Sequence, residues 1–330
     1  MPELRRVAPR PPIDVSRPSL AGRSGLADDV TSNSAGAVRQ TAQQALERLA
    51  VEMRPQLHRY CARMTGSVID GEDVLQEALL KAVEAAPRSE PLDNPEGWLF
   101  RIAHNAALDF LRRRARYNAA HSDEDLDMIA ASTSPVTDRQ IVAASLQTFM
   151  RLPVAQRSAV ILRDVLGYSV DEVCTIMCGS VPATKGALQR GRVRLRELAE
   201  ESDDVRPPEL ETAERARLMH YVERFNARDF DSLRDMLADD VRLEMVNRTR
   251  RAGRHDVSEY FGRYAQTSPW YCVPGFVDRR PAIIMFDPQD PSGPPRYFVL
   301  LDWENGSIVN IRDFLFAHYA IEGAELFTLE

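Results

Sequence analysis

The sequence has no long hydrophobic run, and its cysteines and aromatic residues are few. No apolar stretch approaches the ~20 residues that a membrane-spanning helix needs, so we expect no membrane partner. The first forty residues are rich in Pro, Arg, Ser and Gly and lack the apolar segment of a secretory signal. Two interpretations of them stay open, a disordered tail or a misassigned start. Without a signal or a span, a cytoplasmic location is expected.

The four cysteines are too scattered to indicate a disulfide framework, which fits a reducing compartment. Cys174 and Cys178 are four residues apart and could share a helix face. A metal site would need further Cys or His ligands near them, and the sequence offers none. We therefore interpret these cysteines as small buried residues and expect no metal and no cofactor.

A strong positive charge is also lacking, since the net charge is −7. This balance argues against a protein that binds DNA tightly by itself. The charge is uneven, however, and local sign matters more than the total when a protein binds DNA within a larger assembly. The basic clusters are Arg112, Arg113, Arg114 and Arg116, and then Lys185, Arg190, Arg192, Arg194 and Arg196, with Asp123, Glu124, Asp125 and Asp127 between them.

The chain is long enough for two or three domains, and its pattern changes along its length. Helical periodicity dominates the front, and strand-like runs separated by Gly, Pro and Asp dominate the rear. We expect a multidomain protein with two all-α modules followed by an α+β domain. The expected parts are a disordered tail over 1–40, a helical bundle over 41–117, an acidic linker over 118–138, a helix-turn-helix module over 139–200, a linker over 201–211, and the α+β domain over 212–330.

The segment 70–116 is the most informative part of the helical bundle. An acidic helix with an apolar stripe is expected over 70–86, a proline-broken loop over 87–95, and a long helix over 97–117 that ends in arginines. The spacing of Trp98 indicates a core anchor rather than a residue that stacks on a base.

The second module has the pattern of a helix-turn-helix. A helix over 157–166 is ended by Gly167, and Ser169 with Glu172 forms a capping-box pattern at the start of the next helix. A turn at 178–180 leads to a basic helix over about 182–198. Such a basic last helix is typical of one that enters a DNA major groove.

Two blocks of the front half resemble the extracytoplasmic-function (ECF) sigma factors, small initiation subunits of bacterial RNA polymerase. The resemblance covers about residues 43–199 and implies a sigma region 2 followed by a sigma region 4. The first block has the form D-x-E-D-x-x-Q-E and is matched by Asp70, Glu72, Asp73, Gln76 and Glu77. The second, W-L-F-R-I-A-x-N…D-x-x-R-R, is matched by Trp98 to Asn105, Asp109, Arg112 and Arg113.

This resemblance implies that core polymerase and promoter DNA are the partners, through the clamp helices and the flap of the enzyme. The docking residues would be Asp73, Gln76 and Glu77, whose acidic character suits a basic coiled coil. A solvated helix face is the alternative for this segment. The acidic linker, 121–127, would thread through polymerase channels, or it is a plain tether.

Promoter contacts are also implied by the resemblance. Asn105 and the loop 87–95 would form a pocket for a base flipped from the −10 element, and the arginines would neutralise strand phosphates. The −10 residues would be Arg101, Asn105, Asp109, Arg112 and Arg113. The −35 residues would be Thr184, Lys185, Gln189, Arg190, Arg192 and Arg194, with a solvated basic face as the alternative.

The chain departs from the family pattern at both promoter contacts. The loop 87–95 lacks the aromatic residue that relatives often carry. The last helix starts Pro182-Ala183-Thr184-Lys185-Gly186-Ala187 rather than Gly-Thr-Val-[Lys/Arg]-Ser-Arg, and Gly186 costs ~1 kcal/mol of helix stability relative to Ala. We infer weaker or altered −35 recognition.

The rear domain resembles the SnoaL-like cone, which is shared with nuclear transport factor and ketosteroid isomerase. Helices are expected over 212–227, 231–237 and 257–264, and strands over 241–246, 281–286, 296–303 and 307–316. Cones of this class hold a pocket for a small ligand or a regulator, although aromatic residues here are more often core. The pocket candidates are Tyr260, Tyr264, Trp303, Phe314 and His318, and the candidate acids and bases are Asp302, Asp313 and His318.

The sequence thus predicts a sigma factor that is not an enzyme, with a C-terminal domain that regulates it in cis. Two alternatives stay open. One is a ligand-binding or enzymatic SnoaL-like protein with a vestigial sigma half, and the other is a helix-turn-helix regulator that works without polymerase.

Overall fold

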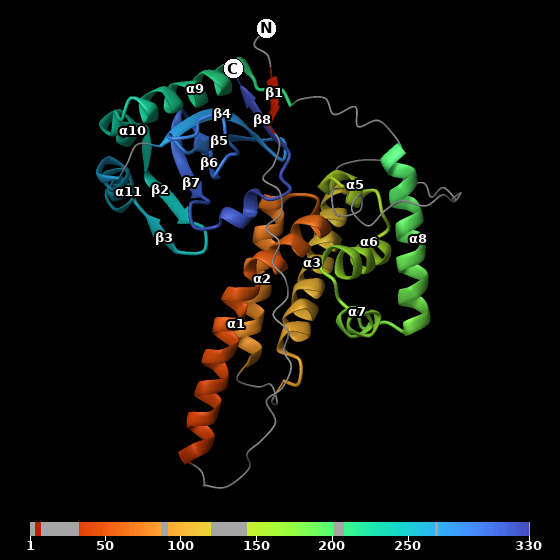
Figure 1. The fold of residues 1–330 in the computed structure, drawn as a ribbon. Coiled ribbons are helices and arrows are strands. Elements are labelled where there is room, and N and C mark those ends of the chain that lie inside the picture. Colours follow the sequence, from red (N-terminus) through yellow and green to blue (C-terminus); the bar gives the residue numbers. More distant parts are fainter. Residues whose placement is uncertain are drawn as a thin grey trace. The chain divides into compact units, whose positions relative to one another are not determined.

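The computed structural model describes residues 4–7, 33–86, 92–119, 144–200, 208–267 and 270–329. The described residues form two compact units, one within residues 12–201 and one made of residues 1–11 with residues 202–330. The first is helical and the second combines a curved sheet with helices (Figure 1). The predicted fold class, all-α modules followed by an α+β domain, is confirmed.

Helices α1 (Asn33–Thr65), α2 (Val68–Ala85) and α3 (Pro95–Ala119) form the first helical module. The chain turns between α1 and α2 at Gly66, whose φ of +81° favours glycine. Ser67 then caps α2, because its hydroxyl accepts hydrogen bonds from the N–H groups of Ile69 and Asp70. A Cβ at Gly71 would lie 2.6 Å from the backbone of Ala62, so glycine permits the close approach of α1 and α2.

The second helical module contains the predicted helix-turn-helix. Its capping box is confirmed, since Ser169 Oγ accepts from Glu172 N at 3.2 Å and Glu172 Oε2 accepts from Ser169 N at 2.7 Å. Cys178 ends α7 in the left-handed conformation, with φ +52°, and starts the turn. The elements are α5 (Leu146–Met150), α6 (Val154–Val160), the π-helical turn η2 (Ile161–Val165), α7 (Val170–Met177) and α8 (Val181–Glu200).

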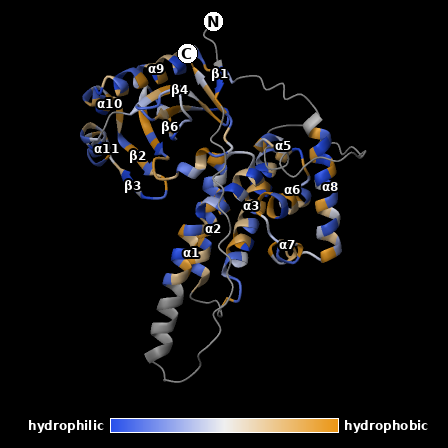
Figure 2. Ribbon diagram, in the orientation of Figure 1, coloured by the Kyte–Doolittle hydropathy of each residue, from blue (hydrophilic) through white to orange (hydrophobic). Residues whose placement is uncertain are grey.

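The two helical modules share one hydrophobic core. The Phe100 ring of α3 contacts Tyr60 of α1 at 5.9 Å between centroids and Tyr168, which precedes α7, at 5.0 Å, both edge to face. Hydrophilic stretches alternate with hydrophobic ones along α3 and α8 in Figure 2, as expected of helices that bury one face. The modules are therefore two parts of one folded unit.

Within the described part of the chain, one mixed sheet has the strand order β1-β8-β4-β5-β6-β7-β2-β3. The β2–β7 pair is parallel and the remaining pairs are antiparallel. Helices α9 and α11 contact β4 and β2 respectively, and α10 lies between them in the sequence. The strands are β1 (Leu4–Val7), β2 (Leu237–Met245), β3 (Thr249–Ala252), β4 (Tyr271–Val277), β5 (Arg280–Phe286), β6 (Tyr297–Glu304), β7 (Ser307–Asp313) and β8 (Leu326–Leu329). The helices are α9 (Thr212–Asn226), α10 (Phe230–Asp235), α11 (Arg254–Gln266) and the 3-10 turn η3 (His318–Ile321).

The prediction of a disordered tail over 1–40 is wrong at two places. Leu4–Val7 form β1, which pairs with β8 at the far end of the chain, and α1 already begins at Asn33. No local pattern indicates β1, because whether an edge strand forms depends on the sheet edge with which it pairs. The acidic linker, 121–127, lies outside the described residues.

None of the helices in the described ranges is long and apolar enough to cross a bilayer.

Candidate polymerase and nucleic-acid interfaces

Helix α2 separates the carboxylates of the first sequence block into buried and outward groups. Glu72 is fully buried and forms an ion pair with Arg54 of α1, and Asp70 is buried beside Arg114 of α3 at 3.4 Å. Asp73 is exposed, whereas Gln76 and Glu77 are half-buried on the opposite side from the apolar stripe. Asp70 and Glu72 therefore hold the helices together, and the three predicted docking residues are those that reach the surface.

Glu77 connects the predicted docking face to the predicted DNA face. Its carboxylate accepts a hydrogen bond from Arg113 of α3 at 2.7 Å and pairs with Lys81 at 2.8 Å. The hydrogen bond from Arg113 holds the pKa of Glu77 below its ordinary value, and that of Arg113 is raised in turn. Asp109 extends this network, since it lies 3.8 Å from Lys81 Nζ and also accepts from Arg112 at 3.1 Å. The sequence placed these side chains on two separate surfaces, and the structure brings them together.

Helix α3 presents an outward row of polar side chains. Arg101 and Asn105 are exposed and four residues apart, so they lie on one face. Arg112 and Arg113 are exposed further along the same helix. Trp98 packs against the hydrophobic core, as its spacing predicted. Most of the loop 87–95 lies outside the described residues, so the base pocket predicted there is described only at Asn105 and at the start of α3.

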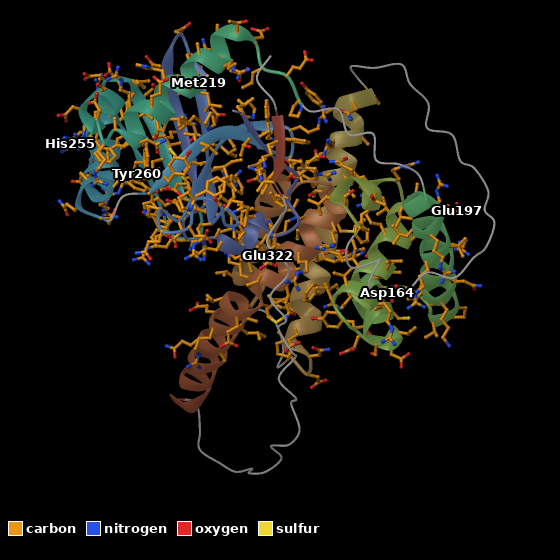
Figure 3. The ribbon with its side chains drawn as sticks, turned by 45° about the horizontal axis from the view of Figure 1, so that its top comes forward. Asp164, Glu197, Met219, His255, Tyr260 and Glu322 are labelled. Carbon is orange, nitrogen blue, oxygen red and sulfur yellow. The ribbon has the colours of Figure 1, made fainter. Side chains whose placement is uncertain are left out.

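The predicted −35 residues of helix α8 are exposed, ion-paired or buried. Lys185, Gln189 and Arg190 are exposed. Arg192 Nε donates to Asp164 Oδ2 at 2.9 Å, and Arg194 Nη1 donates to Glu197 at 2.9 Å, so both arginines are ion-paired within the module. Figure 3 labels Asp164 and Glu197 among the helices of this unit.

Thr184, which was also predicted to contact the −35 element, is buried in this structure. The residue is 3% exposed, and its hydroxyl lies near the Gly179 turn. Thr184 is thus part of the turn that positions α8, because the helix places it toward α7 while Lys185 points outward.

A buried polar seam joins the two helical modules, and the sequence did not indicate it. The Tyr60 hydroxyl lies 2.7 Å from His104 Nδ1 and 2.8 Å from Ser158 Oγ. Burial lowers the pKa of His104 to about 4, so the imidazole is neutral at physiological pH. Each residue is an ordinary member of a helical pattern, and only the packing of α1, α3 and α6 makes them neighbours.

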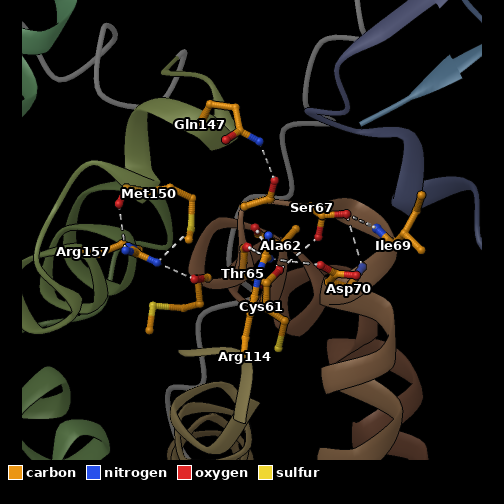
Figure 4. A network of polar contacts seen from close by, with 12 residues as sticks. Cys61, Ala62, Thr65, Ser67, Ile69, Asp70, Arg114, Gln147, Met150 and Arg157 are labelled. Atoms are coloured by element: carbon orange, nitrogen blue, oxygen red, sulfur yellow. Dashed lines mark hydrogen bonds and ion pairs between the residues drawn. The ribbon is translucent and has the colours of Figure 1, made fainter. Parts of the chain in front are cut away.

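Arg157 forms the second part of this seam (Figure 4). Its guanidinium donates to the carbonyl of Met64 at 2.6 Å and to those of Met150 and Leu152 at 3.0 Å each. Gln147 adds a bond to the Gly66 carbonyl at 3.0 Å. The end of α1 and the start of the second module are therefore held by charge-assisted hydrogen bonds to backbone oxygens.

In the C-terminal domain, a buried carboxylate lies among tyrosines. Asp313 Oδ2 accepts from the hydroxyls of Tyr260 and Tyr264 at 2.9 Å each, and Oδ1 accepts from Leu315 N at 2.7 Å. The Tyr264 hydroxyl also lies 2.9 Å from that of Tyr297. Burial raises the pKa of Asp313 above its ordinary range. Figure 3 shows Tyr260 on its helix in this domain.

The remaining candidates of this domain lie in different environments. Asp302 is exposed and accepts from Asn310 at 2.8 Å, and Trp303 is half-buried beside it in β6. Phe314 stacks on Phe298 at 4.1 Å and is core. His318 is exposed, with its ring edge-on to Tyr297. Of the candidate acids and bases, Asp302 and His318 are therefore at the surface, whereas Asp313 is in the core.

The family model "Sigma-70 region 2" matches residues 49–117, and "Sigma-70, region 4" matches residues 146–195. The ECF RNA polymerase sigma factor SigM of Mycobacterium tuberculosis is 33% identical over 154 residues, which are 47% of this chain and 76% of that protein. The chain belongs to the ECF sigma factor family.

As a sigma factor, the protein is a promoter-recognition subunit of RNA polymerase, not an enzyme, and it binds core polymerase and promoter DNA. The crystal structure of M. tuberculosis SigJ is similar over 81% of this chain and 95% of that chain, with 19% identity and a TM-score of 0.32. A putative ketosteroid isomerase from Kribbella flavida is similar over 30% of this chain and 74% of that chain, with 19% identity and a TM-score of 0.24.

Proposed function

We propose that this sigma factor docks on the polymerase clamp helices through the outward face of α2. The support is that Asp73, Gln76 and Glu77 reach the surface, while the neighbouring carboxylates Asp70 and Glu72 are used in buried ion pairs. An acidic face of this kind complements a basic coiled coil and speeds the encounter. The helix-turn-helix module would contact the flap.

The proposed promoter contacts are made mainly by the exposed residues among those predicted on α3 and α8. Arg101 and Asn105 would hold the melted −10 strand, with Asp109, Arg112 and Arg113 at its edge. Lys185, Gln189 and Arg190 would read the −35 duplex, because the helix of this module presents them to solvent. Arg192 and Arg194 would contribute only where DNA outcompetes Asp164 and Glu197.

We further propose that the division 41–117, 118–138, 139–200, 201–211 and 212–330 is the functional one, with β1 added to the last part. The C-terminal domain would regulate the sigma module in cis, and the protein would act in the cytoplasm, where polymerase is. Of the predicted pocket residues, His318 and Trp303 are the ones that a regulator or small ligand would reach, because they are exposed and half-buried respectively.

Transcription in vitro tests this assignment. Core polymerase with this chain should produce promoter-dependent transcripts from genomic fragments, and core polymerase alone should not. A Lys185→Ala, Gln189→Ala variant should retain core binding and lose −35-dependent transcripts, and Asn105→Ala should reduce permanganate reactivity of the −10 strand. Core binding without any transcript would refute the promoter contacts, whereas absence of core binding would refute the dock.

A comparison of the full chain with residues 12–201 tests the regulation. This truncation removes β1 together with the domain that β1 completes, so no unpaired strand remains. Equal transcript yields at equal protein concentration would contradict regulation in cis and leave the sigma activity intact.

A further inference from the structure

The edge of the C-terminal sheet is closed by the opposite end of the chain. Strand β1 runs antiparallel to β8, with Leu4 opposite Leu329 and Val7 opposite Leu326. Thr328 adds a side-chain hydrogen bond, since its hydroxyl donates to the Arg5 carbonyl at 3.3 Å. Residues 1–11 accordingly belong to the compact unit of residues 202–330.

Strand β8 has the features of an acceptor edge. All of Leu326, Phe327, Thr328 and Leu329 are at most 9% exposed, and none of them is charged or proline. Charge, proline and bulges are what natural proteins use to block an open sheet edge. Here β1 covers the edge instead, so its removal would leave unpaired N–H and C=O groups beside apolar side chains.

The position of β8 does not depend on β1. On its other side β8 pairs with β4, with Phe327 opposite Phe276. The residue before it, Glu325, exchanges two bonds with Asp278, in which Asp278 N donates to the Glu325 carbonyl and Glu325 N donates to the Asp278 carboxylate, at 2.9 Å each. Asp278 and Arg279 have positive φ values in the tight β4–β5 turn, which holds this anchor in place. The acceptor edge would therefore persist when β1 is absent.

Strand β1 in turn has the features of a short docking segment. Arg5 and Arg6 are exposed, and Pro2 and Pro9 bracket the strand in the sequence. Proline limits the length of the strand, and the two charges protect its own outer edge from further pairing. Four residues form only a few ladder hydrogen bonds, so the strand can dissociate without unfolding the domain.

We propose that the β8 edge is a β-strand docking site whose occupant is residues 4–7 of the same chain. The sigma module, residues 12–201, is then attached to the C-terminal domain at both of its ends, and dissociation of β1 leaves one attachment. This proposal does not depend on the residue roles proposed above, because it concerns only how the chain ends pair.

A peptide-binding experiment on the full chain without residues 1–11 tests the site. A fluorescent peptide of residues 1–11 should bind this variant saturably and should bind the intact chain at least tenfold more weakly, because the edge is occupied there. In a strand only alternate N–H groups face the neighbour, so one of the peptides Arg5→Pro and Arg6→Pro should lose at least tenfold in affinity and the other should bind almost normally.

Hydrogen exchange provides a readout that needs no peptide. Those amides of Leu326–Leu329 that face β1 should exchange faster without residues 1–11, while those that face β4 and those of β5 and β6 stay protected and report that the domain is folded. Thr328→Val should weaken peptide binding several-fold, since it removes the bond to the Arg5 carbonyl.

Three results would overturn the proposal. One is a folded variant that binds no peptide, and another is equal affinity of both proline peptides. The third is a dimer that the intact chain forms and that the variant without residues 1–11 does not form, which would show that a second copy supplies the strand.

Discussion

Individual side chains of the helical unit divide into those that hold the fold and those that remain for partners. Asp70, Glu72 and Arg157 are committed to buried contacts, whereas Asp73, Arg101 and Lys185 face outward. Glu77 belongs to both groups, since it is partly exposed and pairs with Arg113. Its proposed partner would therefore compete with an ion pair that is already present.

Glu77→Gln should reduce affinity for core polymerase several-fold with little effect on folding. The ion pairs with Arg113 and Lys81 are at the surface, where such pairs contribute about 0–1 kcal/mol. Binding to immobilised core enzyme and urea unfolding would measure the two effects. Glu52→Gln, an exposed carboxylate of α1, is the matched control and should change neither quantity. Equal losses of affinity in both variants would contradict a dock at Glu77.

His104 should make the stability of the helical unit pH-dependent. An unfolded histidine titrates near its ordinary pKa of 6.5, but burial lowers the folded value to about 4. The unfolded state therefore binds the proton first, and stability present above pH 6.5 is lost as the pH falls toward 4, by up to about 3 kcal/mol.

Unfolding in urea at a series of pH values, measured for the natural chain and for a variant without His104, checks this expectation. His104→Gln should have a smaller decrease of stability between pH 6.5 and 4 than the natural chain. His220 is exposed and supplies the control. The substitution His220→Gln should leave the decrease unchanged. A decrease identical in the natural chain and in His104→Gln would show that carboxylates alone cause it.

At the scale of elements, α8 is positioned by one glycine and weakened by another. A Cβ at Gly191 would lie 2.7 Å from Val160 Cγ2 and 3.1 Å from the Gln156 carbonyl. The three atoms nearest to a Cβ at Gly186 all belong to the flexible end of Arg190, the closest at 3.2 Å. The close packing of α6 and α8 therefore requires glycine at the first position and not at the second.

The substitutions Gly191→Ala and Gly186→Ala should shift stability in opposite directions. Overpacking at residue 191 is expected to cost about 1–3 kcal/mol. At residue 186, the higher helix propensity of alanine should stabilise by up to ~1 kcal/mol. Thermal unfolding followed by circular dichroism measures both, and stabilisation by Gly191→Ala would contradict the close contact between the helices.

The whole molecule should unfold in two steps. The described residues form two compact units with separate cores, so each is expected to melt as its own cooperative unit. Arg157→Gln should lower only the transition of the helical unit, by leaving backbone carbonyls without a donor. Asp313→Asn should lower only that of the C-terminal domain. Calorimetry would refute this division if a single transition moved with either variant.

Local sequence patterns were sufficient to predict many of the structural features of this protein. The apolar stripe of α2, the capping box at Ser169 and Glu172, and the basic last helix can be recognised in the sequence because each depends on residues close together in the chain. The same holds for the family, whose two blocks lie on single helices. The outward position of Asp73 and Lys185 also follows from helical spacing.

The structural features that the sequence did not predict depend on packing between residues that are distant in the chain. The Tyr60–His104–Ser158 seam, the burial of Thr184 and the pairing of β1 with β8 join residues that are distant in the chain or that face a neighbour not visible in the pattern. A residue's partner across a core or a sheet edge depends on which surfaces meet, and no local period specifies it. The sequence by itself therefore determined the helices, the family and the outward polar residues, whereas the tertiary structure decided which of those residues are already engaged and that the two ends of the chain complete one domain.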